Sequence, residues 1–350
     1  MKKFPLNSRN TKLFGRTLFI NDKLWLIHSA SGCEFTFTGR KLSLSIGCDI
    51  DAYKNGLRCN KPRVAVLCNG RPVVKKVIDE LCENFSIISS DSVVTKTIRI
   101  VKLSEAAFSL ACVSDAVIDD DAVIFPTPRN SLKIEFIGDS ITCGYGVDDC
   151  NSQSEFATEA ENAMKSYAYV ASGILGADYS LFSYSGYGLI SGYTGDGKRN
   201  TRELIMPWYE TVGFSYSSVD GQKTQDLPWD FNNSPNDIVV VNIGTNDNSF
   251  CTFDKSRYNE FEDAYLKFLR SVRRCEKNAL IICTIGTITQ EPMPYIENAV
   301  RRMNDQRIKT LLLPQQDGTL GFGSNWHPSE DTHLAAGEVL ADFIASVTGQ

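Results

Sequence analysis

The sequence predicts a two-domain chain in which an antiparallel β-sandwich precedes an α/β domain built on a parallel sheet. The chain has 350 residues, and at about 150 residues per domain this length favours two domains. Residues 12–126 alternate apolar and polar side chains with a period of two, whereas residues 133–347 alternate short apolar runs with segments of helical period. A proline-containing stretch at residues 125–130 lies between the two patterns. We therefore expect domains over residues 1–128 and 129–350.

Strands with one buried face account for the first pattern, because a period of two places alternate side chains on opposite faces of a sheet. Asn69 and Gly70 form a strong tight-turn signal at the end of one of these strands. No long helical period interrupts the pattern, which favours an antiparallel sandwich. The predicted strands cover residues 33–37, 42–46, 63–68, 93–103 and 106–113.

Alternating strands and helices predict the second domain. Residues 237–243 form a continuous apolar run, as expected for a strand buried on both faces. Residues 256–275 carry an apolar stripe at helical spacing. Strand alternating with helix implies a parallel sheet with helices on both faces, and the long segment 185–235 is expected to form a binding rim. The remaining predicted strands cover residues 133–137, 179–184, 279–285 and 311–313, and the remaining helices cover residues 164–175, 295–309 and 329–347.

Composition excludes two classes of partner. Thirty-six Lys and Arg residues against 42 Asp and Glu residues give a formal net charge of −6, so the basic footprint of a nucleic-acid-binding protein is absent from the sequence. No apolar run approaches the roughly 20 residues of a membrane helix. The first residues do not read as a signal peptide, and the eleven cysteines contain no C-x-x-C pair. We expect a cytoplasmic protein with reduced thiols, or a secreted one if a leader has been removed.

Polar segments follow the predicted parallel strands, where an open sheet binds its ligands. They are Gly-Asp-Ser at 138–140, Ser-Tyr-Ser-Gly at 183–186, Gly-Thr-Asn-Asp at 244–247 and, before the last helix, Asn-Trp-His-Pro at 325–328. A serine nucleophile needs a base within hydrogen-bond reach, and the oxygen that becomes negative needs donors aimed at it. Serine, histidine and amide donors at one edge therefore predict acyl transfer. Asp139 and Asp247 are expected to be structural, Asp139 as the cap of a turn and Asp247 in ordering its loop.

These segments resemble the sequence blocks of the GDSL/SGNH hydrolases. Residues 137–146 resemble the first block, 185–188 the second and 244–247 the third, while Trp-His-Pro-Ser at 326–329 resembles the last. That last block and the sandwich ahead of the hydrolase blocks are more narrowly similar to carbohydrate esterase family two. The resemblance implies a flavodoxin-like αβα three-layer hydrolase domain preceded by a jelly-roll domain. It also implies removal of acetyl groups from polysaccharides such as xylan and glucomannan.

The resemblance assigns roles to particular residues. Ser140 would be the nucleophile and His327 the general base. The backbone N–H groups of Ser140 and Gly186, with the side-chain amide of Asn246, would form the oxyanion hole. Neither a metal nor an organic cofactor is implied, and three histidines supply a zinc site poorly.

This chain departs from the pattern of the family in the acid that orients the histidine. Many relatives place an aspartate two or three residues before the histidine, whereas Asn325 and Ser324 stand there in this chain. An Asp-to-Asn change in a Ser-His-Asp triad costs roughly 10⁴ in rate. A backbone carbonyl near Ser324 or Asn325 is the favoured acceptor, which would leave a Ser–His dyad. The alternative base is His333, with Glu330 three residues before it.

Aromatic side chains are expected to hold the substrate, because sugar C–H groups pack against rings. The candidates are Trp326, Tyr187, Trp208 and Trp229. The predicted function is therefore a carbohydrate O-acetyl esterase that acts on acetylated oligosaccharides or polysaccharides. Two alternatives stay open: a carbohydrate-binding protein whose hydrolase domain has decayed, and an esterase or acyltransferase for a lipid or other acyl ester.

Overall fold

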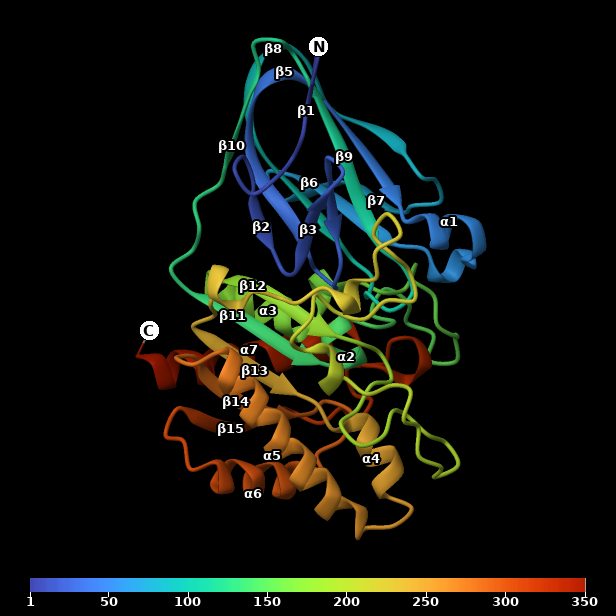
Figure 1. Cartoon of the computed structure of the whole chain (residues 1–350), viewed down its shortest axis with the longest axis vertical. Helices are drawn as coiled ribbons and strands as arrows, with labels where there is room; N and C mark the ends of the chain where they lie inside the picture. The colour runs from blue at the N-terminus through green and yellow to red at the C-terminus, as the bar shows by residue number, and fades with distance from the viewer. Residues whose placement is uncertain (350) are drawn as a thin grey trace. The chain divides into compact units, whose positions relative to one another are not determined.

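The computed structural model describes residues 1–349, which divide into two compact units (Figure 1). The antiparallel unit contains Met1–Arg129 together with Ala157–Glu161 and Thr211–Leu227, and the parallel unit contains the remaining residues. Two short stretches of the predicted second domain thus pack with the first unit. Such packing joins residues far apart in the chain, and no local sequence pattern indicates it.

The antiparallel unit is one hydrogen-bonded sheet, in which the long strands each pair with several other strands. The sheet has the order β3-β4-β9-β5-β8-β6-β7, with β1 paired to β9, and β2 and β10 paired to β5. A short helix α1 (Ile50–Asn55) follows β5. The strands are β1 (Lys2–Phe4), β2 (Lys12–Phe14), β3 (Thr17–Ile20), β4 (Lys23–Leu26), β5 (Gly32–Cys48), β6 (Arg63–Cys68), β7 (Arg71–Val77), β8 (Glu83–Lys102), β9 (Ala111–Ile118) and β10 (Val123–Pro126).

The sheet curls because β5 and β8 are long and irregular in register. β5 pairs with β8 over almost its whole length, and the register shifts between Gly39 and Lys41 and again between Leu42 and Ser43. Such irregularities bend a strand and increase its twist. Figure 1 shows both strands curving around the interior of this unit, where Phe35, Phe37 and other apolar side chains are fully buried. The antiparallel fold predicted for this half is confirmed, as a curled sheet rather than two separate ones.

Two local expectations in this unit had different outcomes. The turn at Asn69 and Gly70 is confirmed, with φ angles of 49° and 77°, the left-handed geometry of a tight hairpin turn. The strand predicted over residues 106–113 is wrong at its start, because β9 begins at Ala111. The N–H of Leu110 donates instead to the Asp49 side chain, at 2.8 Å.

The parallel unit contains a five-stranded sheet of order β12-β11-β13-β14-β15, and all of its strand pairs are parallel. Its strands are β11 (Lys133–Gly138), β12 (Asp178–Ser183), β13 (Ile238–Asn242), β14 (Leu280–Ile285) and β15 (Ile308–Leu312). Its helices are α2 (Ser140–Cys143), α3 (Tyr167–Ile174), α4 (Thr245–Cys251), α5 (Arg257–Cys275), α6 (Met293–Met303) and α7 (Glu330–Thr348).

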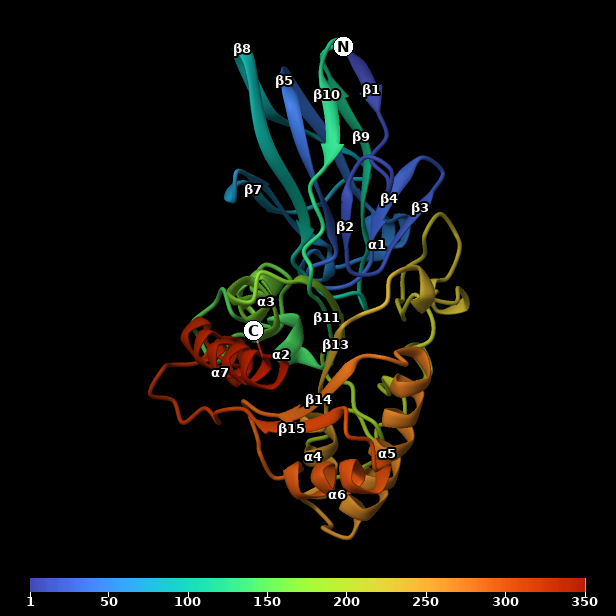
Figure 2. The ribbon, with the colours of Figure 1, turned by 90° about the vertical axis from the view of Figure 1, so that its left-hand side faces the viewer.

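Helices cover both faces of this sheet. Figure 2 shows α3 and α7 together on one side and α5 and α6 on the other, and the two helices of each pair are in contact. The predicted three-layer arrangement is therefore confirmed. The helix predicted over residues 295–309 is too long, because Asn304 adopts a left-handed φ of 51° and ends α6 at Met303. Asparagine tolerates that conformation better than most residues, and β15 then begins at Ile308.

The register of the sheet brings three strand ends to one level. Gly138 at the end of β11 is paired with Ser183 of β12 and with Asn242 of β13. The loops after these strands therefore begin side by side, although they are far apart in the sequence.

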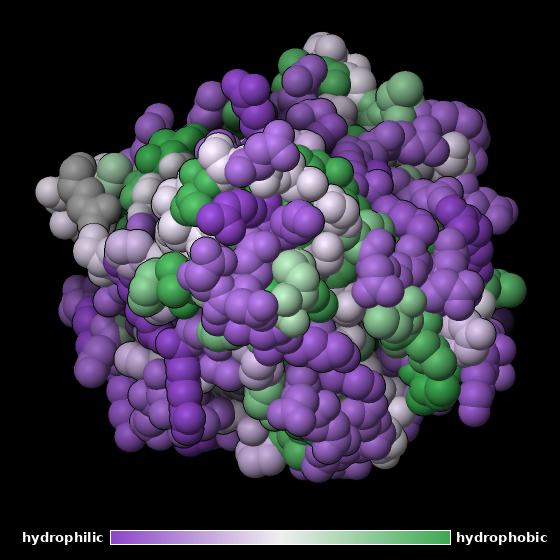
Figure 3. Space-filling model, turned by 90° about the horizontal axis from the view of Figure 1, so that it is seen from above, coloured by the Kyte–Doolittle hydropathy of each residue, from purple (hydrophilic) through white to green (hydrophobic). Residues whose placement is uncertain are grey.

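The surface of the protein is mainly polar on the face seen from above (Figure 3). On that face, Figure 3 shows apolar residues in small separate groups, as is ordinary for a protein surface. Within residues 1–349, no helix has the length and apolar character needed to cross a bilayer.

Candidate active site

Ser140 lies at the start of α2, directly after the central strand β11. Asp139 caps this helix, since its carboxylate accepts a hydrogen bond from the N–H of Ile141 at 3.1 Å, which confirms the expected capping role. A Cβ on Gly138 would lie 2.1 Å from Oγ1 of Thr142, so the sharp exit from the strand requires glycine. Ser140 itself keeps 6 % of its surface exposed. Burial raises the pKa of Asp139 to about 7, although the hydrogen bond from Ile141 opposes this shift.

His327 contacts Ser140 directly. Its Nε2 lies 2.8 Å from Oγ of Ser140, and its Nδ1 lies 3.1 Å from the backbone carbonyl of Asn325. A carbonyl oxygen only accepts, so Nδ1 carries the proton and Nε2 is the acceptor for the serine hydroxyl. Burial lowers the pKa of His327 to about 4, against the opposing effect of the backbone carbonyls of Asn325 and Ser324. The imidazole is therefore a neutral base near pH 7.

The loop before His327 is held in an unusual conformation. Asn325 and Trp326 both have left-handed φ angles, 51° and 59°, which turn the Asn325 carbonyl towards the imidazole. The amide nitrogen of Asn325 contacts the Tyr145 hydroxyl at 3.4 Å. The Asn325 side chain thus points to Tyr145, and its backbone supplies the acceptor for Nδ1.

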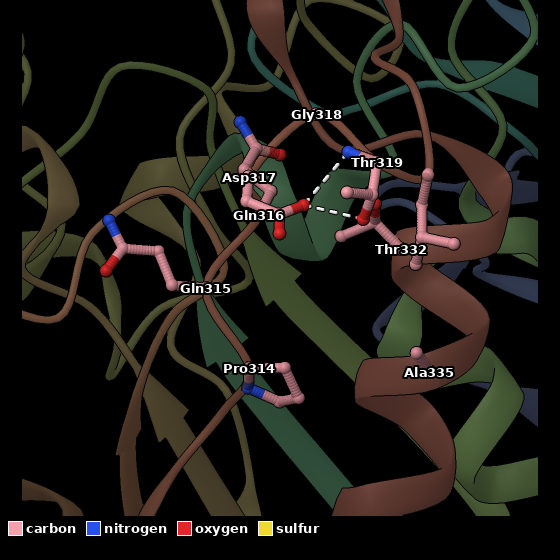
Figure 4. Close-up of a pocket in the computed structure, with 9 residues that line it drawn as sticks. Pro314, Gln315, Gln316, Asp317, Gly318, Thr319, Thr332 and Ala335 are labelled. Atoms are coloured by element: carbon pink, nitrogen blue, oxygen red, sulfur yellow. Dashed lines mark hydrogen bonds between the residues drawn. The ribbon is translucent and has the colours of Figure 1, made fainter.

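Gln316 also stabilises the loop before His327. Its side-chain amide donates to the carbonyl of Trp326 at 2.9 Å. Gln316 also lines a small pocket formed by residues 314–320 with Thr332 and Ala335 of α7 (Figure 4). Within it, the Asp317 carboxylate accepts from the backbone and hydroxyl of Thr319. The residues that line this pocket include neither Ser140 nor His327.

His333 and Glu330 do not form the alternative pair. His333 is fully buried in α7, and its Nδ1 accepts a hydrogen bond from the backbone N–H of Tyr167 at 3.2 Å. Burial lowers its pKa to about 3, with a smaller contribution from His327. The Glu330 carboxylate instead pairs with Lys165 at 2.5 Å. The surroundings of His333 are therefore those of a structural residue and not of a base.

Gly186 and Asn246 lie on the loops that follow β12 and β13. Gly186 has a left-handed φ of 82°. The Asn246 side-chain amide donates one hydrogen to the carbonyl of Tyr187 at 2.9 Å, which ties the two loops together. The roles of Gly186, Asn246 and the Ser140 N–H as oxyanion donors stay predictions.

Asp247 also joins the loops that follow β12 and β13. Its buried carboxylate accepts hydrogen bonds from the backbone N–H groups of Leu189, Ile190 and Ser191, at 2.9, 2.7 and 3.2 Å. Burial raises its pKa to about 6, and these hydrogen bonds oppose the shift. The expectation that Asp247 orders its loop is confirmed.

The four aromatic candidates occupy different environments. Trp326 is 53 % exposed next to His327, and its ring meets Phe322 edge-on with 5.2 Å between centroids. Tyr187 is only 3 % exposed and packs 5.0 Å from the ring of Tyr184. Trp208 and Trp229 are half-buried. Trp326 is therefore the candidate whose ring is available at the surface beside the base.

Tyr145 is a site residue that the sequence reasoning missed. Its ring stacks on the imidazole of His327, with 3.9 Å between centroids and 27° between planes. Tyr145 lies inside the segment 137–146 already singled out, but only three-dimensional contact reveals its partner. Glu203 was missed as well: its half-buried carboxylate lies over Gly186, where a Cβ would be 3.3 Å from Oε2.

The sequence of this chain is similar to those of two curated esterases. Cellulase/esterase CelE of Acetivibrio thermocellus is 34 % identical over 225 residues, covering 62 % of this chain and 26 % of that protein. An acetylxylan esterase / glucomannan deacetylase of Cellvibrio japonicus is 27 % identical over 220 residues, covering 61 % of this chain and 57 % of that protein. The matched region thus spans about a quarter of the first relative and just over half of the second.

Solved structures match over nearly the whole chain. A family two carbohydrate esterase from Clostridium thermocellum, in complex with cellohexaose, has a TM-score of 0.82 at 26 % identity and covers 97 % of this chain and 99 % of that one. An acetyl xylan esterase from the rumen bacterium Butyrivibrio proteoclasticus shares the fold, with a TM-score of 0.87 at 22 % identity and coverage of 98 % and 97 %. The model of the GDSL-like lipase/acylhydrolase family matches residues 136–341, the segment that holds Ser140, Gly186, Asn246 and His327. The chain belongs to the GDSL-like lipase/acylhydrolase family, and within it resembles the family two carbohydrate esterases.

Proposed function

We propose that this protein is a carbohydrate O-acetyl esterase that removes acetyl groups from xylan- or mannan-type oligosaccharides through a Ser140–His327 dyad. The observation that carries the proposal is the 2.8 Å contact between Oγ of Ser140 and Nε2 of His327, with Nδ1 held by a backbone carbonyl. The relatives named esterase and acetylxylan esterase support the reaction class and the substrate class.

The first half of the reaction forms an acetyl-enzyme. Oγ of Ser140 attacks the carbonyl carbon of the acetyl ester while Nε2 of His327 takes its proton. The carbonyl oxygen becomes negative and receives hydrogen bonds from the N–H groups of Ser140 and Gly186 and from the second amide hydrogen of Asn246. The C–O bond to the sugar then breaks, and the imidazolium returns its proton to the sugar oxygen.

The second half releases acetate. A water molecule attacks the acetylated Ser140 while His327 again accepts a proton, and collapse of the tetrahedral intermediate returns that proton to Oγ. Throughout, the Asn325 carbonyl keeps Nδ1 protonated, the orientation that an acidic side chain supplies in a triad.

Substrate binding is assigned to the exposed ring of Trp326, which precedes the base and is 53 % exposed. We leave the buried Tyr187 out of this surface and keep Trp208 and Trp229 as secondary candidates. The −6 net charge suits a neutral sugar better than a polyanion.

Hydrolysis of an aryl acetate tests the dyad. Ser140→Ala and His327→Ala are each expected to lower kcat by at least about 10³, because each removes one partner of the proton transfer. Ser346→Ala, an exposed serine of α7, is the matched control and is expected to keep full activity. His333→Gln is expected to lower the melting temperature and to keep kcat. Full activity of Ser140→Ala, or a folded but inactive His333→Gln, would overturn the assignment.

Asn325→Gly separates the backbone acceptor from the side chain. Glycine adopts the left-handed φ of this position without strain, so the carbonyl stays in place and kcat is expected to fall less than about fivefold. A loss as large as that of His327→Ala would contradict a main-chain acceptor.

Ester chain length tests the acyl group. The proposal predicts faster turnover of acetyl than of octanoyl esters. A preference for octanoyl esters would favour a lipid substrate, and glycan binding without turnover of any ester would favour a binding protein.

A further inference from the structure

Tyr145 presents the face of its ring to His327. The ring centroids lie 3.9 Å apart with 27° between the planes, and only 7 % of Tyr145 is exposed. We propose that Tyr145 is a positioning residue that fixes the plane of the His327 imidazole and stabilises its protonated form through the ring face, in a site whose Nδ1 partner is an uncharged carbonyl. This inference rests on the proposed function, in which His327 takes up a proton.

The backbone conformation on both sides of Tyr145 places its ring next to the His327 imidazole. Both neighbours are glycines with left-handed φ angles, 73° at Gly144 and 69° at Gly146. A Cβ on Gly144 would lie 2.5 Å from the carbonyl oxygen of Asn162, and one on Gly146 would lie 2.3 Å from Oγ of Ser324. The chain therefore turns sharply on both sides of Tyr145, which brings its ring beneath the histidine loop.

Hydrogen bonds join the Tyr145 segment to both catalytic partners. The N–H of Tyr145 donates to the carbonyl of Ser140 at 3.1 Å, and the N–H of Ser324 donates to the carbonyl of Gly146 at 3.1 Å. The Asn325 amide nitrogen contacts the Tyr145 hydroxyl at 3.4 Å. The segment around Tyr145 is thus connected both to the start of α2 and to the loop that carries the base.

The chemistry of the site gives the ring face a second role. When His327 accepts the serine proton, a full positive charge forms on a partly buried side chain, and the carbonyl of Asn325 offers only a dipole to it. The face of an aromatic ring is negative and attracts a cation within about 6 Å of its centroid. The Tyr145 face therefore lies where the imidazolium forms, and it favours the charged state more than the neutral one.

A purely structural role is the competing explanation. The Tyr145 ring also packs against Phe156, with 5.2 Å between centroids, as core residues commonly do. Volume and shape would then matter, and the electron density of the ring face would not. The two explanations differ in their response to fluorination, which weakens the negative face while changing the shape of the ring little.

The test is a series of Tyr145→Phe and Tyr145→fluorinated-phenylalanine variants, with Tyr145→Leu as the variant that lacks a ring. Tyr145→Phe keeps the ring face and removes the hydroxyl with its 3.4 Å contact to Asn325, so kcat for an aryl acetate is expected to stay within about threefold. Successive fluorination is expected to lower kcat steadily, to about tenfold for the most fluorinated ring, with KM unchanged. Melting temperatures are expected to stay level across the fluorinated series, and Tyr145→Leu is expected to lose at least as much activity as its last member.

A level kcat across the fluorinated series would overturn the inference, and so would a Tyr145→Leu variant with the kcat of Tyr145→Phe. His327→Ala, measured beside the series, separates this failure from failure of the proposed function. An inactive His327→Ala with a flat series refutes only the role of Tyr145. An active His327→Ala refutes the proposed base, and the inference with it.

Discussion

At the scale of single residues, the proposed chemistry depends on the neutral state of His327. Burial lowers the pKa of its imidazole to about 4, and the Asn325 carbonyl places the proton on Nδ1. A base acts in its unprotonated form, so activity is present above this pKa and is lost as pH falls through it. The same burial makes the imidazolium costly to form, which is why the contacts of its ring with Asn325 and Tyr145 matter.

The pH dependence of activity follows from this requirement for an unprotonated imidazole. We expect kcat/KM for an aryl acetate to rise through an inflection near pH 4 and to stay level at higher pH, instead of rising near the ordinary histidine value of about 6.5. Asp139 and Asp247, whose pKa values are about 7 and about 6, titrate near the ordinary histidine value. Asp139→Asn and Asp247→Asn are therefore the controls: an inflection near 6.5 that persists in both variants would contradict the neutral base.

The sequence identified Ser140 and His327 because each lies in a short segment whose residue types suit acyl transfer. It left open whether a backbone carbonyl or the His333–Glu330 pair completes the site, since Glu330 and His333 satisfy a plausible spacing. Only packing decides this, because α7 buries His333 against Tyr167 and turns Glu330 towards Lys165. Tyr145 was missed for the same reason: stacking joins positions 182 residues apart in the chain.

At the scale of elements, the site is assembled by loops that leave one edge of the parallel sheet. Four of the five strands were predicted to within one residue at each end, because their apolar runs are local and long, whereas β15 begins at Ile308 and not at the predicted residue 311. The end of α6 was predicted wrongly. Asn304 ends the helix by adopting a left-handed conformation, whereas the sequence beyond it is still compatible with a helix. Loop contacts such as those of Asp247 with Leu189, Ile190 and Ser191 join two segments and leave no periodic trace in either.

Gly146→Ala tests the loop geometry. Its φ is 69°, and a Cβ would lie 2.3 Å from Oγ and 2.9 Å from N of Ser324, so the histidine loop must move. We expect kcat to fall at least about tenfold, because small displacements of a base cost rate steeply. Gly176→Ala is the matched control, with a φ of 58° and no atom within 4 Å of its Cβ. It is expected to lose only about 1 kcal/mol of unfolding free energy, with kcat unchanged. Equal kcat in the two variants would contradict the account.

At the scale of the whole molecule, the two units are not consecutive in the chain. Residues 211–227 belong to the antiparallel unit, where the N–H of Tyr216 donates to the carbonyl of Ala107 at 2.8 Å. His28 lies 2.8 Å from the carbonyl of Val212, through Nε2. The sequence indicated two folds from their periods, but a change of period along the chain does not reveal a segment that returns to the earlier unit.

This arrangement predicts the behaviour of a fragment. Residues 129–350 on their own lack the residues against which 211–227 pack, and buried side chains such as Val212 and Val219 would meet water. We expect the fragment to melt at a lower temperature than the full chain and to bind a hydrophobic dye more strongly. A fragment that melts cooperatively at the temperature of the full chain would show that 211–227 do not depend on the antiparallel unit.

The most direct test of the central claim is deacetylation of acetylated xylan and mannan oligosaccharides, followed by NMR so that each acetyl position is resolved. We expect the protein to release acetate from defined sugar positions, and Ser140→Ala to leave every acetyl group in place under the same conditions. Intact oligosaccharides after incubation with the active protein, or equal acetate release by Ser140→Ala, would contradict a carbohydrate esterase that acts through Ser140.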